Sequence, residues 1–385
     1  MNNQSKLFFL RAAVSVALLF SLNWASELSQ KGEFEQRYLW VVRNALTSKS
    51  SINQMINFAT LNRFNHILVQ VRGRGDAYYN SMIVPKSQLI NDANFDPLAY
   101  LIPRAKEKGI HVHAWVNTYL LWSSRSKPVQ DDHLFYSHPE WIDQNKQIQL
   151  NLSEEMQNFN SGKNGNEGFY LSPNHPKVNS YLLTVFRDLI ENYELDGLHL
   201  DYVRFHDFEY GQNPAAIAYF RKYNGMKAYP PEETSGVSEW NDHRRKAITD
   251  LVRETKNLIE TVRPGVELSA AVKPNLYQAR ERYFQEWDVW LAAGYLDKAV
   301  VMNYTKNLKE FADNIDIMYD NLPSKYRKKI VMGIATYNQP ADQVVDKVKY
   351  TRVTRFKGIS FFSYNVMAQN PQYFRLIKKI LYPRG

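Results

Sequence analysis

The sequence predicts an α/β protein of the (β/α)8 TIM-barrel class, and three observations support this prediction. Eight short apolar segments recur along the 385 residues, and amphipathic helical patterns fill the gaps between them. The chain length suits one barrel with insertions. The glycine-rich fingerprint of an open dinucleotide-binding sheet is absent, since Gly73-Arg74-Gly75 lacks a third glycine and does not open a helix.

The apolar segments alternate with helical segments along the whole chain. Long connections of residues 118–171 and 206–241 follow the third and fourth strands, and connections of this length are uncommon unless they are functional. The predicted helices include residues 53–63, 96–108, 177–193, 239–262 and 371–381. The predicted strands are residues 37–43, 66–72, 110–117, 195–204, 266–273, 298–304, 329–337 and 358–364.

The first residues resemble an export signal. Lys6 and Arg11 flank or interrupt an apolar run that ends at Leu22, which is short for a membrane span. We therefore expect residues 1–25 to be a signal peptide or an N-terminal membrane anchor, residues 26–36 a linker, and residues 37–385 a single barrel domain. An exported protein, periplasmic or associated with the cell envelope, follows from this division, and a buried N-terminal helix is the weaker alternative.

Composition narrows the functional class. The net charge is +9, which favours anionic partners, but the basic residues are dispersed and no nucleic-acid-binding motif is present. The absence of cysteine excludes disulfides, thiolate catalysis and cysteine-ligated metals. The 25 tyrosines, 20 phenylalanines and 8 tryptophans suit both a large core and the stacking of aromatic rings on sugars.

Polar and aromatic side chains gather where the predicted strands end, which is the catalytic rim of a barrel. Any single member of this set can serve merely to satisfy neighbouring loop backbone, but the set as a whole predicts a site for a polyhydroxylated ligand. The predicted substrate-binding residues are Arg72, His113, Trp115, Asn117, His199, Tyr202, Arg204, Lys273, Asn303, Tyr304, Tyr337 and Tyr364.

Glycosidic cleavage requires two carboxyl groups. Asp201 ends the fourth predicted strand and is the first candidate, with a structural pairing to Arg204 or Arg72 as the alternative. The second carboxyl group is left open among Asp76, Asp207 and Glu209, which lie in or next to the loops of the rim.

A metal site is the competing interpretation of the histidines. His111, His113 and His199 lie on neighbouring predicted strands with Asp201, and such a group could hold zinc. Histidines also fill barrel interiors, where they form hydrogen bonds to one another and to carboxylates. We favour this structural role, so no metal or other cofactor is expected.

Four segments together resemble the bacterial glycosyl-hydrolase-like family 10. They are residues 68–79, 113–117, 171–174 and 196–202, and they keep the order and spacing of the family. The resemblance implies a barrel distantly related to α-amylase-type glycosidases, with Asp201 at the position of the nucleophile. It also implies activity on peptidoglycan strands from which the peptides have been removed.

The chain departs from that family at two positions. Tyr202 stands where many relatives carry a second acid, and Lys273 ends the strand on which amylase-type enzymes place a glutamate. The acid/base partner of Asp201 therefore stays unassigned.

We expect an exported glycoside hydrolase of a bacterial polysaccharide, with amino-sugar glycan such as peptide-free peptidoglycan as the favoured substrate. A catalytically impaired carbohydrate-binding or scaffolding barrel in envelope or exopolysaccharide assembly is the alternative, with cell-envelope assembly proteins as its partners. A metal-dependent sugar deacetylase is the third and weakest hypothesis.

Overall fold

The computed structural model describes residues 34–145, 167–224, 234–354 and 356–382. The predicted export segment and residues 26–33 of the predicted linker lie outside these ranges, so both remain predictions. Within the described ranges, no helix combines the length and the apolar character needed to cross a membrane.

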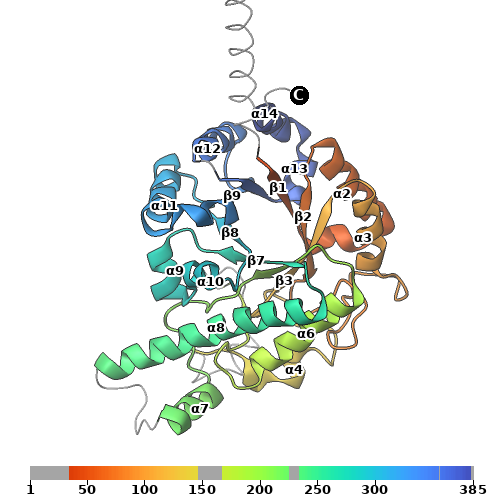
Figure 1. Ribbon diagram of the computed structural model, residues 1–385. Coiled ribbons are helices and arrows are strands. Elements are labelled where there is room, and N and C mark those ends of the chain that lie inside the picture. Colours follow the sequence, from red (N-terminus) through yellow and green to blue (C-terminus); the bar gives the residue numbers. More distant parts are fainter. Residues whose placement is uncertain (1–33, 146–166, 225–233, 355, 383–385) are drawn as a thin grey trace, which may run out of the picture.

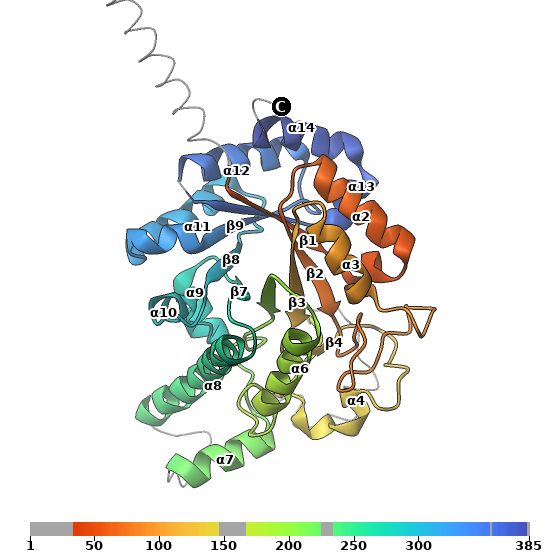
Figure 2. The ribbon, with the colours of Figure 1, turned by 45° about the vertical axis from the view of Figure 1, so that its right-hand side comes forward.

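Eight parallel strands close into a barrel in the order β1-β10-β9-β8-β7-β6-β3-β2. This closure confirms the predicted (β/α)8 fold, and Figures 1 and 2 show the helices arranged around the strands. The barrel strands are β1 (Gln36–Val41), β2 (His66–Arg72), β3 (His111–Asn117), β6 (Gly197–Asp201), β7 (Glu267–Val272), β8 (Lys298–Met302), β9 (Ile330–Ala335) and β10 (Gly358–Phe362).

Helices connect consecutive barrel strands, and their ends follow local sequence signals. The helix α3 begins at Pro97 because the Asp96 carboxylate accepts from the backbone N–H groups of Leu98 and Ala99. The helices on the barrel are α2 (Lys49–Leu61), α3 (Pro97–Lys106), α6 (Val178–Asn192), α8 (Thr234–Val262), α9 (Leu276–Tyr283), α10 (Trp287–Ala292), α11 (Leu308–Asn321), α12 (Ala341–Val353), α13 (Tyr364–Gln369) and α14 (Pro371–Leu381). Short 3-10 helices occur at η1 (Arg43–Leu46) and η4 (Ser324–Lys329).

The two long connections carry secondary structure of their own. The connection after β3 contains β4 (Leu120–Trp122), α4 (Leu134–Ser137), the 3-10 helix η2 (Pro139–Trp141) and β5 (Phe169–Tyr170), and β4 pairs with β5. The connection after β6 contains α7 (Pro214–Asn224) and leads into α8.

Side chains fill the inside of the barrel. The Trp40 ring stands edge-on to the Trp115 ring, with 4.7 Å between centroids, and both are buried. The same cluster includes Tyr38, Leu68, Ala271, Val300 and Val331. Because this layer closes the interior, sites can form only at its two ends. We call the end where the strands finish the mouth and the end where they begin the lower end.

Candidate active site

Asp201 is the last residue of β6 and reaches the mouth beside Asn117, its register partner on β3. The carboxyl group is 6% exposed, and its Oδ1 accepts from the backbone N–H of Tyr202 at 2.7 Å. Burial raises the pKa of Asp201 to about 6, against the opposing effects of that N–H group and of Arg204. Asp201 can therefore take up and release a proton near neutral pH.

Tyr202 ends β6 with an unusual backbone conformation. Its φ of 51° lies in the left-handed region, which is costly for a residue with a side chain. The loop after β3 holds this turn, because Thr118 N–H donates to the Asp201 carbonyl at 2.7 Å. The predicted strand of residues 195–204 therefore stops at Asp201, and the turn leaves the Asp201 side chain at the mouth.

Glu167, just before β5, supplies a second carboxylate. Arg204 Nη2 donates to Glu167 Oε2 at 2.8 Å, and the Tyr170 hydroxyl donates to the same oxygen. Burial acts to raise the pKa of Glu167, but Arg204 and Tyr170 outweigh it and hold that pKa at about 2. Glu167 is therefore ionised at any physiological pH, and its negative charge contributes to the raised pKa of Asp201.

Lys273 follows β7 and completes the charged cluster. Burial and the charge of Arg204 lower the pKa of its ammonium group to about 8, while Glu167 and Asp201 act in the opposite direction. Its Nζ lies 4.4 Å from the centroid of the Tyr283 ring. Two carboxyl groups and two cations thus meet at the mouth, and we call Asp201, Glu167, Arg204 and Lys273 the mouth cluster.

Polar atoms without partners adjoin this cluster. The Tyr304 hydroxyl and Arg204 Nε are buried and have no hydrogen-bond partner among the described residues. Burial raises the pKa of Tyr304 first, and the charge of Asp201 adds to the increase, so the two side chains are neighbours. Because buried polar groups rarely stay unsatisfied, these atoms indicate a place for a polar ligand or water.

Three further predicted residues have clear positions around the mouth. Trp115 Nε1 donates to Asn117 Oδ1 at 2.9 Å, and Asn117 Nδ2 donates to the Gly73 carbonyl at 2.8 Å, so Asn117 fixes the loop after β2. Tyr337 is 55% exposed, and its ring is therefore accessible to a ligand.

The acids predicted as partners of Asp201 occupy other roles. Arg282 holds Asp207 through both carboxylate oxygens, with Nη2 at 2.6 Å from Oδ2. Asp76 accepts from the backbone N–H of Arg74 at 3.1 Å and shapes the loop after β2, and Glu209 is solvent-exposed. None of the three makes a described contact with Asp201, whereas the charge of Glu167 acts on it, so Glu167 is the second carboxylate that the structure places near Asp201.

Three residues predicted to bind substrate follow or end barrel strands but use their side chains in structural contacts, and their binding roles remain predictions. A register shift between Gln70 and Arg72 redirects Arg72, which is fully buried and donates to the carbonyls of Asn117 and Thr118. Asn303 bonds to the Phe311 carbonyl and to Asn314, and thereby ties β8 to α11. Tyr364 packs its ring 5.3 Å from the ring of Phe58 on α2.

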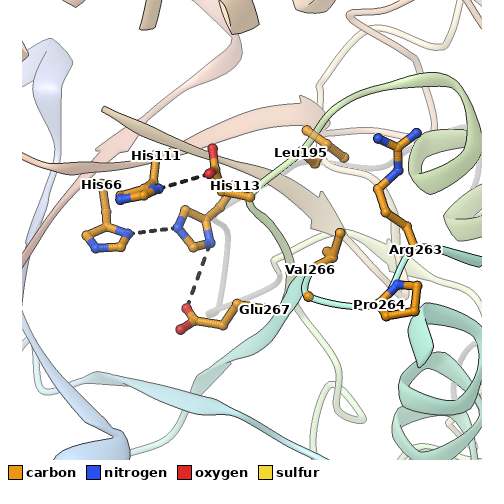
Figure 3. Close-up of a pocket in the computed structure, with 10 residues that line it drawn as sticks. His66, His111, His113, Leu195, Arg263, Pro264, Val266 and Glu267 are labelled. Carbon is orange, nitrogen blue, oxygen red and sulfur yellow. Dashed lines mark hydrogen bonds and ion pairs between the residues drawn. The ribbon is translucent and has the colours of Figure 1, made fainter. Parts of the chain in front are cut away.

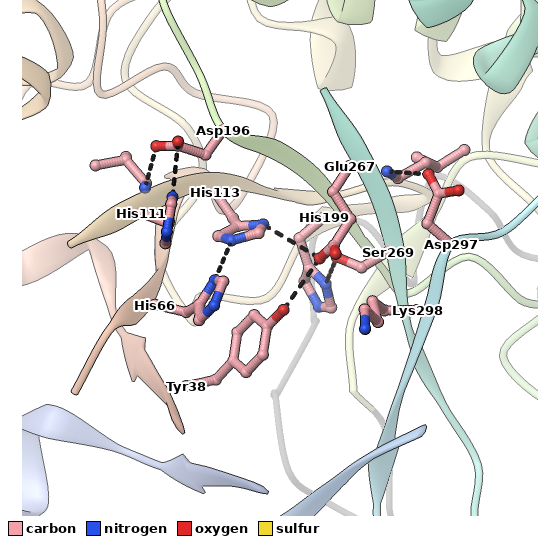
Figure 4. A network of polar contacts seen from close by, with 12 residues as sticks. Tyr38, His66, His111, His113, Asp196, His199, Glu267, Ser269, Asp297 and Lys298 are labelled. Carbon is pink, nitrogen blue, oxygen red and sulfur yellow. Dashed lines mark hydrogen bonds and ion pairs between the residues drawn. The ribbon is translucent and has the colours of Figure 1, made fainter. Parts of the chain in front are cut away.

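The side chains of His113 and His199 lie deeper in the barrel and are buried, so their predicted binding roles remain predictions. His199 Nδ1 is 2.8 Å from Ser269 Oγ, and its ring stands 4.8 Å from Trp40. His113 Nε2 is 2.9 Å from His66 Nδ1 at the lower end, as Figure 4 shows. Gly197 makes room for this imidazole, since a Cβ there would come 2.0 Å from His113 Nδ1.

A polar pocket opens at the lower end of the barrel (Figure 3). Its volume is about 460 Å³, and its lining includes His66, His113, Arg263 and Glu267. Glu267 accepts from the Tyr38 hydroxyl at 3.0 Å, and His111 pairs with Asp196 at 2.9 Å. Contacts at this end of a barrel serve stability, so we place the candidate active site at the mouth.

Among the described residues, the histidines are not grouped with other possible metal ligands. Within the described ranges, no three His, Asp or Glu side chains are grouped as ligands of a metal ion would be. The deacetylase hypothesis therefore has no donor set in this part of the chain.

Paired carboxylates and aromatic side chains at the mouth of a (β/α)8 barrel define a glycosidase-type barrel. Residues 35–349 match the model of the family described as glycosyl hydrolase-like 10, and the chain belongs to this family. Family and fold together support a glycosidase.

Two relatives with similar sequences are bacterial proteins named as glycosyl hydrolases. The chain is 24% identical over 341 residues to the glycosyl hydrolase DigH of Escherichia coli strain K12, covering 82% of this chain and 67% of that protein. It is 23% identical over 264 residues to the glycosyl hydrolase YngK of Bacillus subtilis strain 168, covering 66% of this chain. The match spans 43% of the length of YngK, which is therefore a much longer protein than the shared region.

Solved structures share the fold at low sequence identity. The glycoside hydrolase domain of PgaB (BpsB) from Bordetella bronchiseptica superposes with a TM-score of 0.68 at 13% identity, covering 91% of this chain and 99% of that one. The catalytic domain of β-amylase from Paenibacillus polymyxa superposes with a TM-score of 0.57 at 12% identity, covering 92% and 99%. Both likenesses concern the fold.

Glu167 is the main site residue that the sequence did not predict. It lies in the long connection after β3, whereas the predicted partners were sought near β2 and after β6. Its one sequence signal is its place four residues before the Leu171-Ser172-Pro173-Asn174 segment of the family resemblance.

Proposed function

We propose that this protein is a glycoside hydrolase that cleaves a bacterial amino-sugar glycan such as peptide-free peptidoglycan strands. The observation that carries the proposal is the pair of carboxyl groups at the mouth, Asp201 at the end of β6 and Glu167 just before β5, where burial raises the pKa of Asp201 and Arg204 lowers that of Glu167. Two carboxyl groups with separated pKa values can divide the acid and the anionic roles of glycosidic cleavage. The choice of glycan rests on the family resemblance.

The two pKa values suggest the division of roles. Asp201 donates its proton to the glycosidic oxygen as the bond from that oxygen to the anomeric carbon breaks. Glu167 stays ionised and stabilises the positive charge that develops on the sugar. Water then adds to the anomeric carbon and returns a proton to Asp201. The resemblance implies a nucleophile at Asp201, but Glu167 cannot supply the proton at neutral pH, so we assign proton transfer to Asp201.

The surroundings of the pair suit a sugar. The Tyr304 hydroxyl and Arg204 Nε offer unpaired polar atoms to sugar hydroxyl groups. The exposed Tyr337 ring offers an apolar face to a sugar ring.

The test is incubation of the purified protein with peptide-free glycan strands, with Asp201→Asn beside it. Release of reducing ends by the wild type, lost in the variant, supports the proposal. Binding without release, unchanged in the variant, would instead favour the carbohydrate-binding or scaffolding barrel. Loss of activity with a chelator would point to metal-dependent chemistry and would contradict the assigned roles.

We also propose that the protein is exported to the periplasm or cell envelope, on the basis of the signal-like residues 1–25. Fractionation of cells and N-terminal sequencing of the mature protein test this, and recovery of the full chain in the cytosol would contradict it.

A further inference from the structure

Two arginines follow neighbouring strands at the mouth. Arg43 comes after β1, and its Nη1 donates to Gln70 Oε1 at 2.8 Å. A Cβ on Gly73 would come 2.7 Å from the same Nη1, so the guanidinium lies directly against the Gly73 backbone. Gln70 and Gly73 thus hold the Arg43 side chain in place over the end of β2.

Arg74 lies on the next strand end and extends toward the loop after β3. Its Nε donates to Ser123 Oγ at 3.2 Å, and its Cζ is 5.8 Å from the centroid of the Trp122 ring. The Arg43 guanidinium lies against Gly73, the residue directly before Arg74, and after burial its charge is the next cause that lowers the pKa of Arg74.

Neither arginine has an ionic partner, since no described carboxylate lies within 4 Å of either guanidinium group. Asp76 accepts from the backbone N–H of Arg74 and not from its guanidinium. By contrast, Arg204 pairs with Glu167 at 2.8 Å and Arg282 with Asp207 at 2.6 Å. The charge of Asp76 raises the pKa of Arg74, so this carboxylate offsets part of the two half-buried positive charges, and a bound anion would offset the rest.

We propose that Arg43 and Arg74 form a subsite for a carboxylate group carried by the glycan, an inference that rests on the proposed hydrolase function. Two guanidinium forks match the planar, bidentate geometry of a carboxylate. Strands β2, β3 and β6 are consecutive in the barrel, so the end of β2 that precedes Arg74 and the end of β6 at Asp201 are two strand spacings apart, roughly 10 Å. The charged group is therefore on a sugar adjoining the cleaved bond, and the enzyme prefers acidic glycans.

The test compares two substrates and matched variants. The substrates are peptide-free strands with free carboxyl groups and the same strands after conversion of those groups to uncharged amides. The variants are Arg43→Gln, Arg74→Gln and the double variant, with Arg43→Lys and Arg74→Lys to keep the charge. Arg187→Gln is the control, because Arg187 is exposed on α6 and pairs with Glu191. Thermal unfolding checks that each variant is folded.

We expect the wild type to cleave the acidic strands with a KM about 10-fold lower than that for the amidated strands. Each glutamine variant should raise KM for the acidic strands, the double variant should lose the preference, and the lysine variants should keep part of it. A preference that survives in the double variant, or cleavage of both substrates with equal KM, overturns the subsite.

Binding to the Asp201→Asn protein separates this inference from the proposed hydrolysis. If neither substrate is cleaved, but Asp201→Asn binds acidic strands more tightly through Arg43 and Arg74, the subsite stands and the proposed hydrolysis fails. If both substrates are cleaved without preference, hydrolysis stands and the subsite fails. Competition by inorganic phosphate but not by acetate would show a phosphate site and overturn the carboxylate.

Discussion

The two ends of the barrel both gather ionisable side chains, but they keep them in different charge states. At the mouth, Glu167 and Arg204 stay ionised, while Asp201 and Lys273 titrate at pH values of about 6 and 8. At the lower end, burial lowers the pKa of His66 to about 2 and that of His113 to about 3, so both imidazoles are neutral.

The difference shows in the contacts as well. The His66 ring stacks on the Tyr38 ring with 4.3 Å between centroids, the neutral rings of His66 and His113 bond to each other, and Glu267 accepts from Tyr38 (Figure 4). The mouth instead holds the buried ion pair of Arg204 with Glu167, whereas buried polar atoms without described partners occur at both ends, at Tyr304 and Arg204 and at His113 Nδ1. Residue type alone therefore does not identify the site. Charge state and position along the strand distinguish a reactive end from a packed one.

The largest expected effect separates the two ends by activity. Asp201→Asn removes the proton that the leaving oxygen needs and should lower kcat by about 10²- to 10⁴-fold. Glu267→Gln at the lower end should leave kcat unchanged, because Glu267 bonds to Tyr38 and lies away from the mouth. Steady-state release of reducing ends measures both, and a comparable loss in Glu267→Gln would contradict the comparison.

The second effect concerns the free energy of unfolding in acid, which should depend on the buried histidines below the mouth. The pKa values of His113 and His199 are about 3 in the folded protein, against 6.5 for an ordinary histidine. Unfolding lets both imidazoles take up protons, so stability is complete above pH 6.5 and falls as the pH drops toward 3. The expected slope is about 1.4 kcal/mol per pH unit for each histidine.

Urea unfolding between pH 7 and pH 5 measures this slope. His113→Gln should make the slope shallower, whereas His138→Gln should not, because the His138 side chain is 42% exposed and not enclosed in the barrel. Equal slopes in the wild type and His113→Gln would show that the lower end does not resist protonation.

The third effect concerns the ion pair at the mouth. Glu167→Gln leaves the Arg204 guanidinium buried without its counter-charge and should destabilise the fold by about 1–3 kcal/mol, after allowance for the partial exposure of Glu167. It should also lower kcat. Glu191→Gln breaks the exposed pair with Arg187 and should cost no more than about 0.5 kcal/mol. Equal costs in chemical unfolding would mean that Arg204 is not effectively buried.

The smallest effect tests the coupling inside the mouth cluster. Lys273→Met removes a positive charge that interacts with Asp201, so the pKa of Asp201 should rise. The wild-type kcat/KM should fall as the pH rises through about 6. In the variant this fall should occur at a higher pH, by less than about one pH unit. A fall of kcat/KM at the same pH as in the wild type, or at a lower pH, would contradict the coupling.

The sequence was sufficient to predict the barrel and Asp201. Eight apolar segments separated by helical patterns predict parallel strands, and a carboxyl group at the end of one strand must then lie at the mouth. Strand ends were less predictable, because the predicted fourth strand continued to residue 204 whereas Tyr202 adopts a φ of 51° and ends it. Such a turn depends on the loop after β3, which is remote from Tyr202 in sequence.

Only the tertiary structure decided which side chains share the mouth. Arg72 alternates correctly along β2, yet the register shift beside it turns its side chain away. His113 and His199 point into the barrel as their strand positions predict, but they lie deeper than the mouth. Glu167 reaches Arg204 from 37 residues earlier in the chain. Local patterns report the face of a strand, whereas depth, register and loop contacts arise from packing between distant segments.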